Sequence, residues 1–241
     1  MMATVASRLI DDNDVCFVGT GLPMIAAYAA KASSAPNATL LFESGILDPS
    51  PRHLAVGVGD SPLLLNAQQV LSMRDVLAYL HGGRVTLGFL GAAQIDQHGN
   101  VNTTRIDSDA GDLLIRLPGS GGANDIGASA HRTIIMVRHE RRKFVKHVDY
   151  VTTVGWGRSP YIKGPDLVIT DLAVLGFDVS GKMQVQSVHP GVSWDQIVDS
   201  TEFSLEKPHP WVVTAEPTLE EVQLITQIDP EGFYLTRGGK F

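Results

Sequence analysis

The chain has 241 residues, and 44% of them are hydrophobic, which is enough to bury the core of one large α/β domain or of two small ones. Its formal net charge of −7 argues against a nucleic-acid-binding surface, because neutralising phosphates requires clustered Lys and Arg. The single cysteine, Cys16, excludes an intramolecular disulfide and, within the apolar run Val15-Cys16-Phe17-Val18, is expected in the core. No stretch resembles a signal peptide or a membrane span, so we expect a cytoplasmic protein without membrane contact.

The first part of the chain predicts a helix followed by a β-α-β unit. These elements are expected over residues 5–10 (helix), 15–18 (strand), 23–31 (helix) and 39–42 (strand). The first strand runs into Gly19-Thr20-Gly21, and the second ends at Glu43, directly before Ser44-Gly45. A β-α-β unit is typical of a parallel sheet, which binds ligands at the carboxyl ends of its strands. Glu43 is therefore expected at a ligand-binding edge.

The remainder of the chain continues as a mixture of helices and strands. Residues 48–69, rich in Pro and Gly, predict a long structured loop of the kind that carries function. The later predictions are a helix at 73–82, a strand at 85–90, a hairpin or extended excursion at 103–118, a helix at 126–130, strands at 133–137 and 148–154, a strand and hairpin at 167–177, and helices at 194–200 and 219–227. No repeat or linker divides the chain, so we expect a single domain over residues 1–241.

Glu43 is the residue around which the predicted sheet is organised. An ionised carboxylate at the end of a buried strand loses hydration, so it is usually paired or functional. Its position alone leaves open the simpler role of a turn or cap residue.

Three glycine-rich turns follow predicted strands, at residues 19–21, 91–94 and 119–122. Glycine permits positive φ and close approach of the backbone, so such turns can direct N–H groups at an anion or a developing oxyanion. Each could equally be an ordinary tight turn between a strand and a helix. Met24 stands where the dinucleotide fingerprint requires its third glycine, and no phosphate-binding lysine motif is present, so binding of nicotinamide or nucleoside triphosphates is not expected.

Other kinds of site find less support. Four histidines were candidates for a metal site, namely His139, His147, His189 and His209. They form no compact ligand set and no paired cysteines accompany them, so we expect no metal and regard them as surface or structural residues. Ser44 lacks the glycine of a nucleophile elbow two positions earlier, where Phe42 stands. The basic residues 138–146 could bind a phosphate or a partner subunit, or could form a solvated helix face.

The order of these motifs resembles the β subunit of class I (family I) CoA-transferases, most closely the glutaconate CoA-transferase type. The matching segments are Val18-Gly19-Thr20-Gly21-Leu22-Pro23, Phe42-Glu43-Ser44-Gly45, Gly91-Ala92-Ala93-Gln94-Ile95-Asp96, Gly99-Asn100-Val101-Asn102, Gly119-Ser120-Gly121-Gly122-Ala123-Asn124 and residues 134–156. The resemblance spans nearly the whole chain. It implies an α/β fold with an open, mainly parallel sheet flanked by helices, the CoA-transferase (NagB/RpiA-like) fold.

The resemblance also implies that Glu43 is a nucleophile. In this family the glutamate carboxylate attacks an acyl-CoA thioester to give an acyl-glutamyl anhydride, and the released CoA thiolate then forms a glutamyl-CoA thioester. Gly121 and Gly122 are the expected oxyanion donors, together with Ala123. The residues expected to line the site or to bind CoA are Gly19, Gly21, Ala92, Gln94, Ala123 and Asn124.

By the same resemblance, the substrates are an acyl-CoA and a free, dicarboxylic or branched, acid. Coenzyme A is then a substrate and a covalent intermediate, with no tightly bound cofactor. Ser44-Gly45 stands where many relatives have Asn-Gly, as in the glutaconate type. The family's active site lies where an α-type and a β-type subunit meet, so the chain is expected to be inactive alone. Two alternatives stay open: a CoA-thioester hydrolase or decarboxylase of the same fold, and a structural or regulatory subunit.

Overall fold

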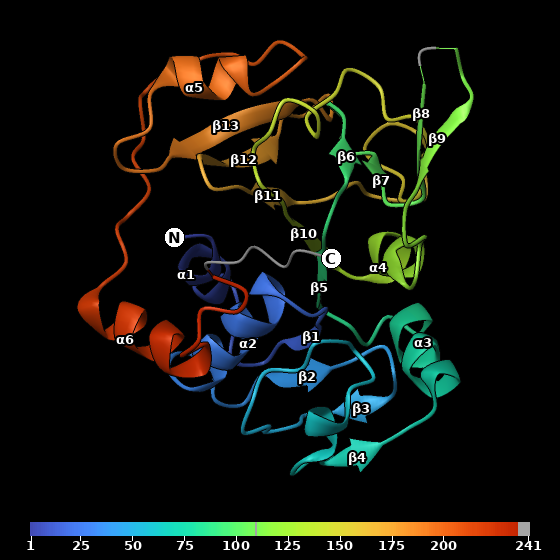
Figure 1. The fold of residues 1–241 in the computed structure, drawn as a ribbon, viewed down its shortest axis with the longest axis vertical. Helices are drawn as coiled ribbons and strands as arrows, with labels where there is room; N and C mark the ends of the chain where they lie inside the picture. Colours follow the sequence, from blue (N-terminus) through green and yellow to red (C-terminus); the bar gives the residue numbers. More distant parts are fainter. Residues whose placement is uncertain (109, 236–241) are drawn as a thin grey trace. The chain divides into compact units, whose positions relative to one another are not determined.

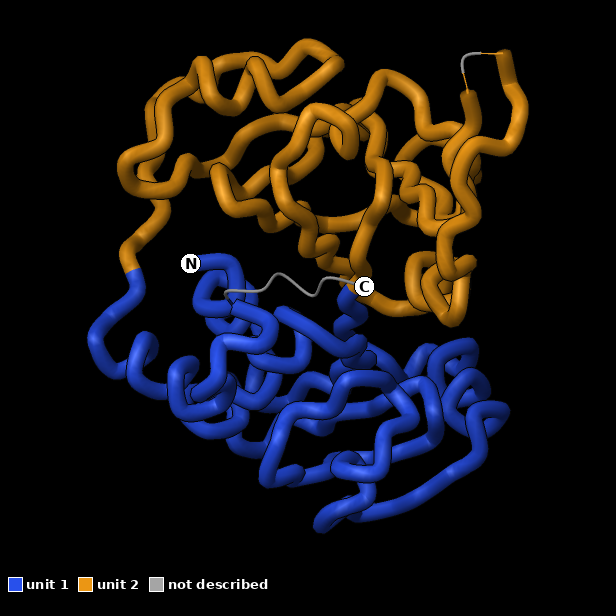
Figure 2. The backbone as a smooth tube through the Cα atoms, in the orientation of Figure 1, with its two compact units in different colours: residues 1–89, 217–241 blue, residues 90–216 orange. Residues whose placement is uncertain are grey.

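The computed structural model describes residues 1–108 and 110–235. The chain forms two compact units, one of residues 1–89 and the segment from Pro217 onward, and one of residues 90–216 (Figure 2). Compactness does not test whether the two units fold independently, so the single domain over residues 1–241 stays a prediction. No helix in the described part of the chain is both long enough and apolar enough to cross a bilayer.

The first unit contains a sheet with strand order β5-β1-β2-β3-β4 (Figure 1). Its strands are β1 (Val15–Phe17), β2 (Thr39–Leu41), β3 (Ile46–Leu47), β4 (Gln69–Val70) and β5 (Leu87–Leu90). β1 pairs in parallel with both β2 and β5, and the short strands β3 and β4 add an antiparallel edge. The predicted β-α-β unit is therefore confirmed, with β2 delivering the chain to Glu43.

The helices of this unit are α1 (Met2–Ser7), α2 (Leu22–Lys31), α3 (Met73–His81) and α6 (Leu219–Ile228), with a 3-10 turn at Ser61–Leu64. α2 packs against α1 and α6, and its many alanines let the backbones approach closely. Beneath it, Cys16 and Phe17 of β1 are buried, which confirms that Cys16 is a core residue. Full burial of a side chain such as Phe17 or Phe42 stabilises the fold by about 1.5–3 kcal/mol.

α3 shows how local sequence sets helix boundaries. Ser72 Oγ accepts a hydrogen bond from the Asp75 N–H, while the Asp75 carboxylate accepts one from the Ser72 N–H, so the two residues form a capping box. The helix ends at His81 before Gly82. Both the predicted start and the predicted stop are confirmed.

The second unit contains a four-stranded sheet and two small hairpins. Its strands are β6 (Gln94–Ile95), β7 (Val101–Asn102), β8 (Arg105–Asp107), β9 (Leu113–Arg116), β10 (Arg132–Met136), β11 (Leu167–Ile169), β12 (Ala173–Phe177) and β13 (Met183–Val188), and its helices are α4 (Ala123–Ser129) and α5 (Trp194–Asp199). β10 and β11 are parallel, whereas β11-β12 and β12-β13 are antiparallel. The hairpins are β6-β7 and β8-β9 (Figure 1), and the second confirms the excursion predicted over residues 103–118.

Two sequence predictions need correction. No strand forms over residues 148–154, because the N–H groups of Thr152 and Thr153 both donate to the carbonyl oxygen of Val101, which interrupts a regular ladder. The predicted long loop of residues 48–69 begins and ends at two short strands, β3 and β4, that were not anticipated. β13 was also missed, although its alternating buried and exposed residues are typical of a half-buried strand.

Candidate functional site

A tight turn positions Glu43 immediately after β2. The Gly45 N–H donates to the Phe42 carbonyl oxygen at 2.9 Å, which closes the turn, and the Phe42 N–H donates to the Ile46 carbonyl oxygen at 3.0 Å as the chain returns into β3. Glu43 occupies the second position of this turn and is half-buried. The turn thus places the carboxylate at the carboxyl end of a parallel strand.

The Glu43 turn requires glycine at position 45. Gly45 has φ = +105°, a conformation that L-residues rarely adopt. A Cβ at this position would collide with the carbonyl oxygen of Leu71, whose N–H donates to the Gly45 carbonyl oxygen at 2.8 Å. The Phe-Glu-Ser-Gly segment is therefore fixed by a close approach between two backbone segments.

The Glu43 carboxylate has no hydrogen-bond or ion-pair partner among residues 1–108 and 110–235. A cap residue would accept a hydrogen bond from a nearby backbone N–H, as Ser72 does in α3. The simpler role of a cap residue is therefore not what the side chain performs. A half-buried, unpaired carboxylate on a fixed turn is free to meet a ligand.

The first glycine turn lies beside the Glu43 strand. The Val18 N–H donates to the Leu41 carbonyl oxygen at 2.9 Å, so β1 and β2 stay paired up to the residues before Gly19 and Glu43. Gly21, with φ = +91°, is the N-cap of α2 and offers no side chain to cap the first N–H groups. The structure therefore brings Gly19 and Gly21 to the same sheet edge as Glu43.

Two hydroxyl groups in this region were missed by sequence reasoning. Ser44 Oγ donates a 2.6 Å hydrogen bond to the Val58 carbonyl oxygen, and the Tyr234 hydroxyl donates a 2.6 Å bond to the Ala55 carbonyl oxygen. The Tyr234 ring also lies next to Gly21, 3.9 Å from where a Cβ of that glycine would stand. Tyr234 follows α6 and is 179 residues from Ala55, so no local pattern could have revealed the contact.

The third glycine turn belongs to the second unit and leads into α4. Gly119 and Gly121 have φ values of +105° and +45°, and Gly122 is the N-cap of α4. The Ala123 N–H donates to the Ser120 carbonyl oxygen at 2.9 Å, so it is already used within the turn. The N–H groups of Gly121 and Gly122 have no acceptor within the described residues. Those two groups remain available to a ligand, whereas the Ala123 N–H is not.

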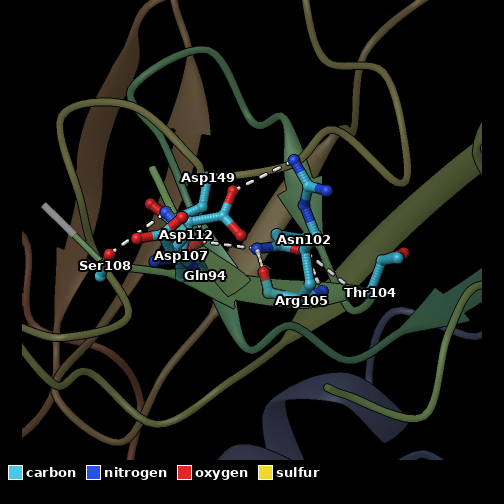
Figure 3. Close-up of polar contacts among 8 residues, drawn as sticks. All are labelled: Gln94, Asn102, Thr104, Arg105, Asp107, Ser108, Asp112 and Asp149. Atoms are coloured by element: carbon cyan, nitrogen blue, oxygen red, sulfur yellow. Dashed lines mark hydrogen bonds and ion pairs between the residues drawn. The ribbon is translucent and has the colours of Figure 1, made fainter. Parts of the chain in front are cut away.

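Gln94 lies at the centre of a polar network between β6 and β7 (Figure 3). Its side-chain oxygen accepts hydrogen bonds from Asn102 Nδ2 at 2.7 Å and from the Asp149 N–H at 3.0 Å, and its Nε2 donates to Asp149 Oδ2 at 2.9 Å. Gln94 and Asn102 are buried, with exposed fractions of 6% and 0%. The Gln94 amide is thus oriented by the protein itself. Ala92, two residues earlier, is only half-buried.

The same network roots the β8-β9 hairpin and the third glycine turn. Asp149 Oδ2 also accepts a hydrogen bond from the Asp107 N–H at 3.1 Å, and Arg105 Nη2 lies 3.2 Å from Asp107 Oδ2 (Figure 3). Next to Asn102, Thr103 exchanges two hydrogen bonds with Gly119: its carbonyl accepts from the Gly119 N–H at 2.9 Å and its hydroxyl donates to the Gly119 carbonyl at 2.8 Å. Gln94 and the Gly119–Gly122 turn therefore belong to one connected structure.

The motif around residues 96–100 shapes a loop. The Asp96 carboxylate accepts hydrogen bonds from the N–H groups of His98 and Asn100 and from Asn100 Nδ2, at 2.8–3.1 Å. Asn100 Oδ1 accepts one from the Gly155 N–H at 2.9 Å. Gly99 has φ = +75°, and a Cβ there would lie 2.6 Å from Pro165 Cγ. This motif holds the loop after β6 in place.

Two of the candidate histidines are buried structural residues. His139 stacks on Phe144 with ring centroids 3.9 Å apart, and its nitrogens contact the hydroxyls of Thr170 and Thr201 at 3.2 and 2.9 Å. Burial lowers its pKa to about 4, and burial lowers the pKa of His189 as well. His147 and His209 are exposed. The expectation of surface or structural histidines is confirmed, and within residues 1–108 and 110–235 no three His, Cys, Asp or Glu side chains form a metal-binding group.

The basic residues 138–146 do not form the helix face that was one of the expectations. The segment is irregular because β10 ends at Met136 and the following residues bond to other loops. Glu140 forms ion pairs with Arg142 at 2.6 Å and Lys143 at 3.3 Å, and Arg141 Nη1 donates to the Thr201 carbonyl at 3.1 Å. Much of the basic charge is therefore used within the unit.

Comparison with known proteins places this geometry in a family. The family model for coenzyme A transferase matches residues 1–200. The chain is 36% identical to the β-type subunit of 3-oxoadipate CoA-transferase from Pseudomonas knackmussii over 239 residues, covering 95% of this chain and 92% of that protein. It is 38% identical to the β-type subunit of glutaconate CoA-transferase from Acidaminococcus fermentans over 221 residues, covering 86% of this chain and 82% of that one.

Solved structures agree with the sequence comparison. The crystal structure of the Acidaminococcus fermentans enzyme superposes with a TM-score of 0.89 at 34% identity, over 98% of this chain and 96% of that one. The crystal structure of the decarboxylase AibA/AibB superposes with a TM-score of 0.86 at 29% identity, over 97% and 95%. The predicted fold class, a mixed and mainly parallel sheet with flanking helices, is confirmed.

The chain belongs to the coenzyme A transferase family, as the β-type subunit of a family I CoA-transferase.

Proposed function

We propose that the chain contributes Glu43 as the covalent nucleophile of an acyl-CoA:carboxylate CoA-transferase. The observation that carries the proposal is the state of Glu43: a half-buried carboxylate without a partner in the described chain, held on a rigid turn at the carboxyl end of β2. A carboxylate that is free in the resting protein can attack a carbonyl without first breaking an ion pair.

In the first half-reaction, a Glu43 carboxylate oxygen attacks the thioester carbonyl of the acyl-CoA donor. A C–O bond forms, the C–S bond breaks, and the products are an acyl-glutamyl anhydride and CoA thiolate. The thiolate then attacks the glutamyl carbonyl of the anhydride, which releases the donor acid as a carboxylate and leaves a glutamyl-CoA thioester. No oxidant, metal or net proton is required in this sequence.

In the second half-reaction, the carboxylate of the acceptor acid attacks the glutamyl-CoA carbonyl. This step forms a second anhydride and frees the thiolate, which attacks the acceptor's acyl carbonyl. The acceptor leaves as its CoA thioester, and the Glu43 carboxylate is regenerated. Each half-reaction passes through tetrahedral oxyanions, which preorganised N–H donors stabilise.

Residues of both units serve this chemistry in the proposal. Gly121 and Gly122 are proposed as oxyanion donors, since their N–H groups have no acceptor in the described chain. The exposed Asn124, together with Ala92 and Ala123, would line the path of CoA. The list of proposed lining residues is completed by Gly19 and Gly21 beside Glu43, and by Gln94. Because the Gln94 amide is already hydrogen-bonded, we propose that it shapes the wall rather than reaching out to CoA.

The substrate class follows from the relatives' names. The two relatives described above are named for 3-oxoadipate and glutaconate, which are both dicarboxylic acids. We therefore propose a dicarboxylic acyl group, with coenzyme A as the transferred group and no tightly bound cofactor. Both relatives are one subunit of a two-subunit enzyme, which supports an α-type partner that completes the active enzyme here. We further propose that the enzyme acts in the cytoplasm.

A decarboxylase or hydrolase acting on a CoA thioester is the second candidate, because the decarboxylase AibA/AibB shares the fold at a TM-score of 0.86. The products separate the two candidates. A transferase converts one acyl-CoA into another without net release of free CoA or carbon dioxide, whereas a hydrolase releases CoA and a decarboxylase releases carbon dioxide.

Exchange of the Glu43 carboxylate for an amide tests the proposal. The Glu43→Gln variant, assembled with the α-type subunit, should lose at least about 10³-fold in kcat/KM for CoA transfer, because an amide cannot form the anhydride. The matched control is Glu220→Gln, on the exposed surface of α6, which should transfer CoA at the wild-type rate. Unchanged turnover by Glu43→Gln would reduce the chain to a structural or regulatory subunit.

A further inference from the structure

Two hydroxyl groups hold the loop of residues 55–59, which we call the Ala55 loop. Ser44 Oγ donates a 2.6 Å hydrogen bond to the Val58 carbonyl oxygen near one end of the loop. The Tyr234 hydroxyl donates a 2.6 Å hydrogen bond to the Ala55 carbonyl oxygen at the other end. Because both ends are held by side chains from other segments, the loop's path does not depend on its own flexible sequence, Ala-Val-Gly-Val-Gly.

The Ala55 loop lies directly against the Glu43 turn. Ser44 is the next residue after Glu43, and a Cβ built on Gly59 would stand 3.7 Å from Ser44 Cβ. The loop continues into Asp60, whose carboxylate accepts hydrogen bonds from the N–H groups of Val56 at 3.1 Å and Ser61 at 2.9 Å. The loop is thus a compact structure beside the nucleophile.

Tyr234 connects this loop to the first glycine turn. Its ring packs beside Gly21 while its hydroxyl reaches Ala55, and only 6% of the residue is exposed. Its own backbone is held by the buried carboxylate of Asp229, which accepts hydrogen bonds from the N–H groups of Phe233, Tyr234 and Leu235 at 2.8, 2.9 and 3.0 Å. Burial, together with nearby carboxylates, raises the pKa of Tyr234, so the hydroxyl stays protonated and can donate.

We propose that Ser44 and Tyr234 are positioning residues that keep the Ala55 loop closed against Glu43 and thereby keep water from the covalent intermediates. The inference rests on the proposed function, in which Glu43 carries those intermediates. Water that reaches the glutamyl-CoA carbonyl forms a C–O bond and breaks the C–S bond. The thiolate leaves as CoA thiol with one proton from water, and the Glu43 carboxylate returns with release of the other proton.

A loosened loop should therefore divert the enzyme from transfer to hydrolysis. In the chain assembled with its α-type subunit, Tyr234→Phe and Ser44→Ala each remove one hydroxyl with little change of volume. We expect each to raise the ratio of free CoA released to CoA transferred by about 3-fold to 10-fold, the effect of losing one buried hydrogen bond on loop opening. Ser44→Thr retains a hydroxyl and should restore the low ratio. Tyr161→Phe, at a residue that is 93% exposed, and Ser34→Ala, at an exposed serine, are the controls and should leave the ratio unchanged.

Hydrogen–deuterium exchange of residues 55–59 gives a second readout that needs no activity. Exchange in this loop should be faster in both hydroxyl-deletion variants than in the wild-type complex. An unchanged product ratio in folded variants would overturn the inference, and so would an equal fall of transfer and hydrolysis together with a lower Tm. If the wild-type enzyme transfers no CoA, the proposed function fails. Exchange in the loop would then still show whether the two hydroxyls hold it.

Discussion

At the scale of single residues, the structure separates side chains that are free from side chains that are already engaged. Glu43 has no partner within the described chain, although it stands at the end of a buried strand. Gln94, which the sequence placed in the same site, makes three hydrogen bonds to Asn102 and Asp149. A sequence motif shows both as polar residues after strands, and only the hydrogen-bond geometry distinguishes the candidate nucleophile from the support.

Gly45 is the residue on which the Glu43 turn depends most. Gly45→Ala should lower the free energy of unfolding by about 2–4 kcal/mol, because alanine must adopt φ = +105° and its Cβ meets the Leu71 carbonyl oxygen. Denaturant unfolding of the purified protein measures the change. Gly57→Ala is the matched control: a Cβ there meets no atom within 4 Å, and the change should stay within about 0.5 kcal/mol. Equal stability of the two variants would show that the turn relaxes easily.

At the scale of secondary-structure elements, local signals predicted most of the fold. The Ser72 capping box, the Pro23 and glycine residues around α2, and the β-branched run of β10 act within a few residues of one another, so sequence reveals them. The strands β3 and β4 escaped prediction because two-residue strands exist only through their pairing with β2 and with each other. The Tyr234 contact with Ala55 spans 179 residues and has no local signature.

The segment from β10 to β11 makes the stability of the second unit depend on pH. The pKa of His139 is lowered by burial to about 4, whereas an unfolded histidine titrates near 6.5. Between these values the unfolded state binds more protons, so stability is full above pH 6.5 and is lost as the pH falls toward 4. The buried His189, whose pKa is also lowered, acts in the same direction.

Urea midpoints measured from pH 7 to pH 4 test this dependence. His139→Gln should flatten the curve, removing up to about 1.4 kcal/mol per pH unit of the wild-type slope over this range. His147→Gln, at an exposed histidine, should leave the slope unchanged. A wild-type slope retained in His139→Gln would mean that other groups cause the acid sensitivity.

At the scale of the whole molecule, the family assignment and the physical analysis agree on a β-type CoA-transferase subunit. The fold, which matches glutaconate CoA-transferase with a TM-score of 0.89, supplies rigid strand ends on which free and engaged polar groups are arranged. In the first unit, Glu43, Gly21 and the Ala55 loop are joined by the contacts of Ser44 and Tyr234. In the second, the Gln94 network supports the Gly119–Gly122 turn. The acyl group, by contrast, is proposed only from the relatives' names.

The most direct test of the central claim is to trap the covalent intermediate. The assembled enzyme would be incubated with acyl-CoA in the absence of acceptor acid and then reduced with borohydride, which converts a glutamyl-CoA thioester to an alcohol. Peptide mass spectrometry should find that conversion at Glu43 alone, together with loss of transferase activity in proportion to the modified fraction. An enzyme that turns over acyl-CoA while every Glu43-containing peptide remains unmodified would contradict the account.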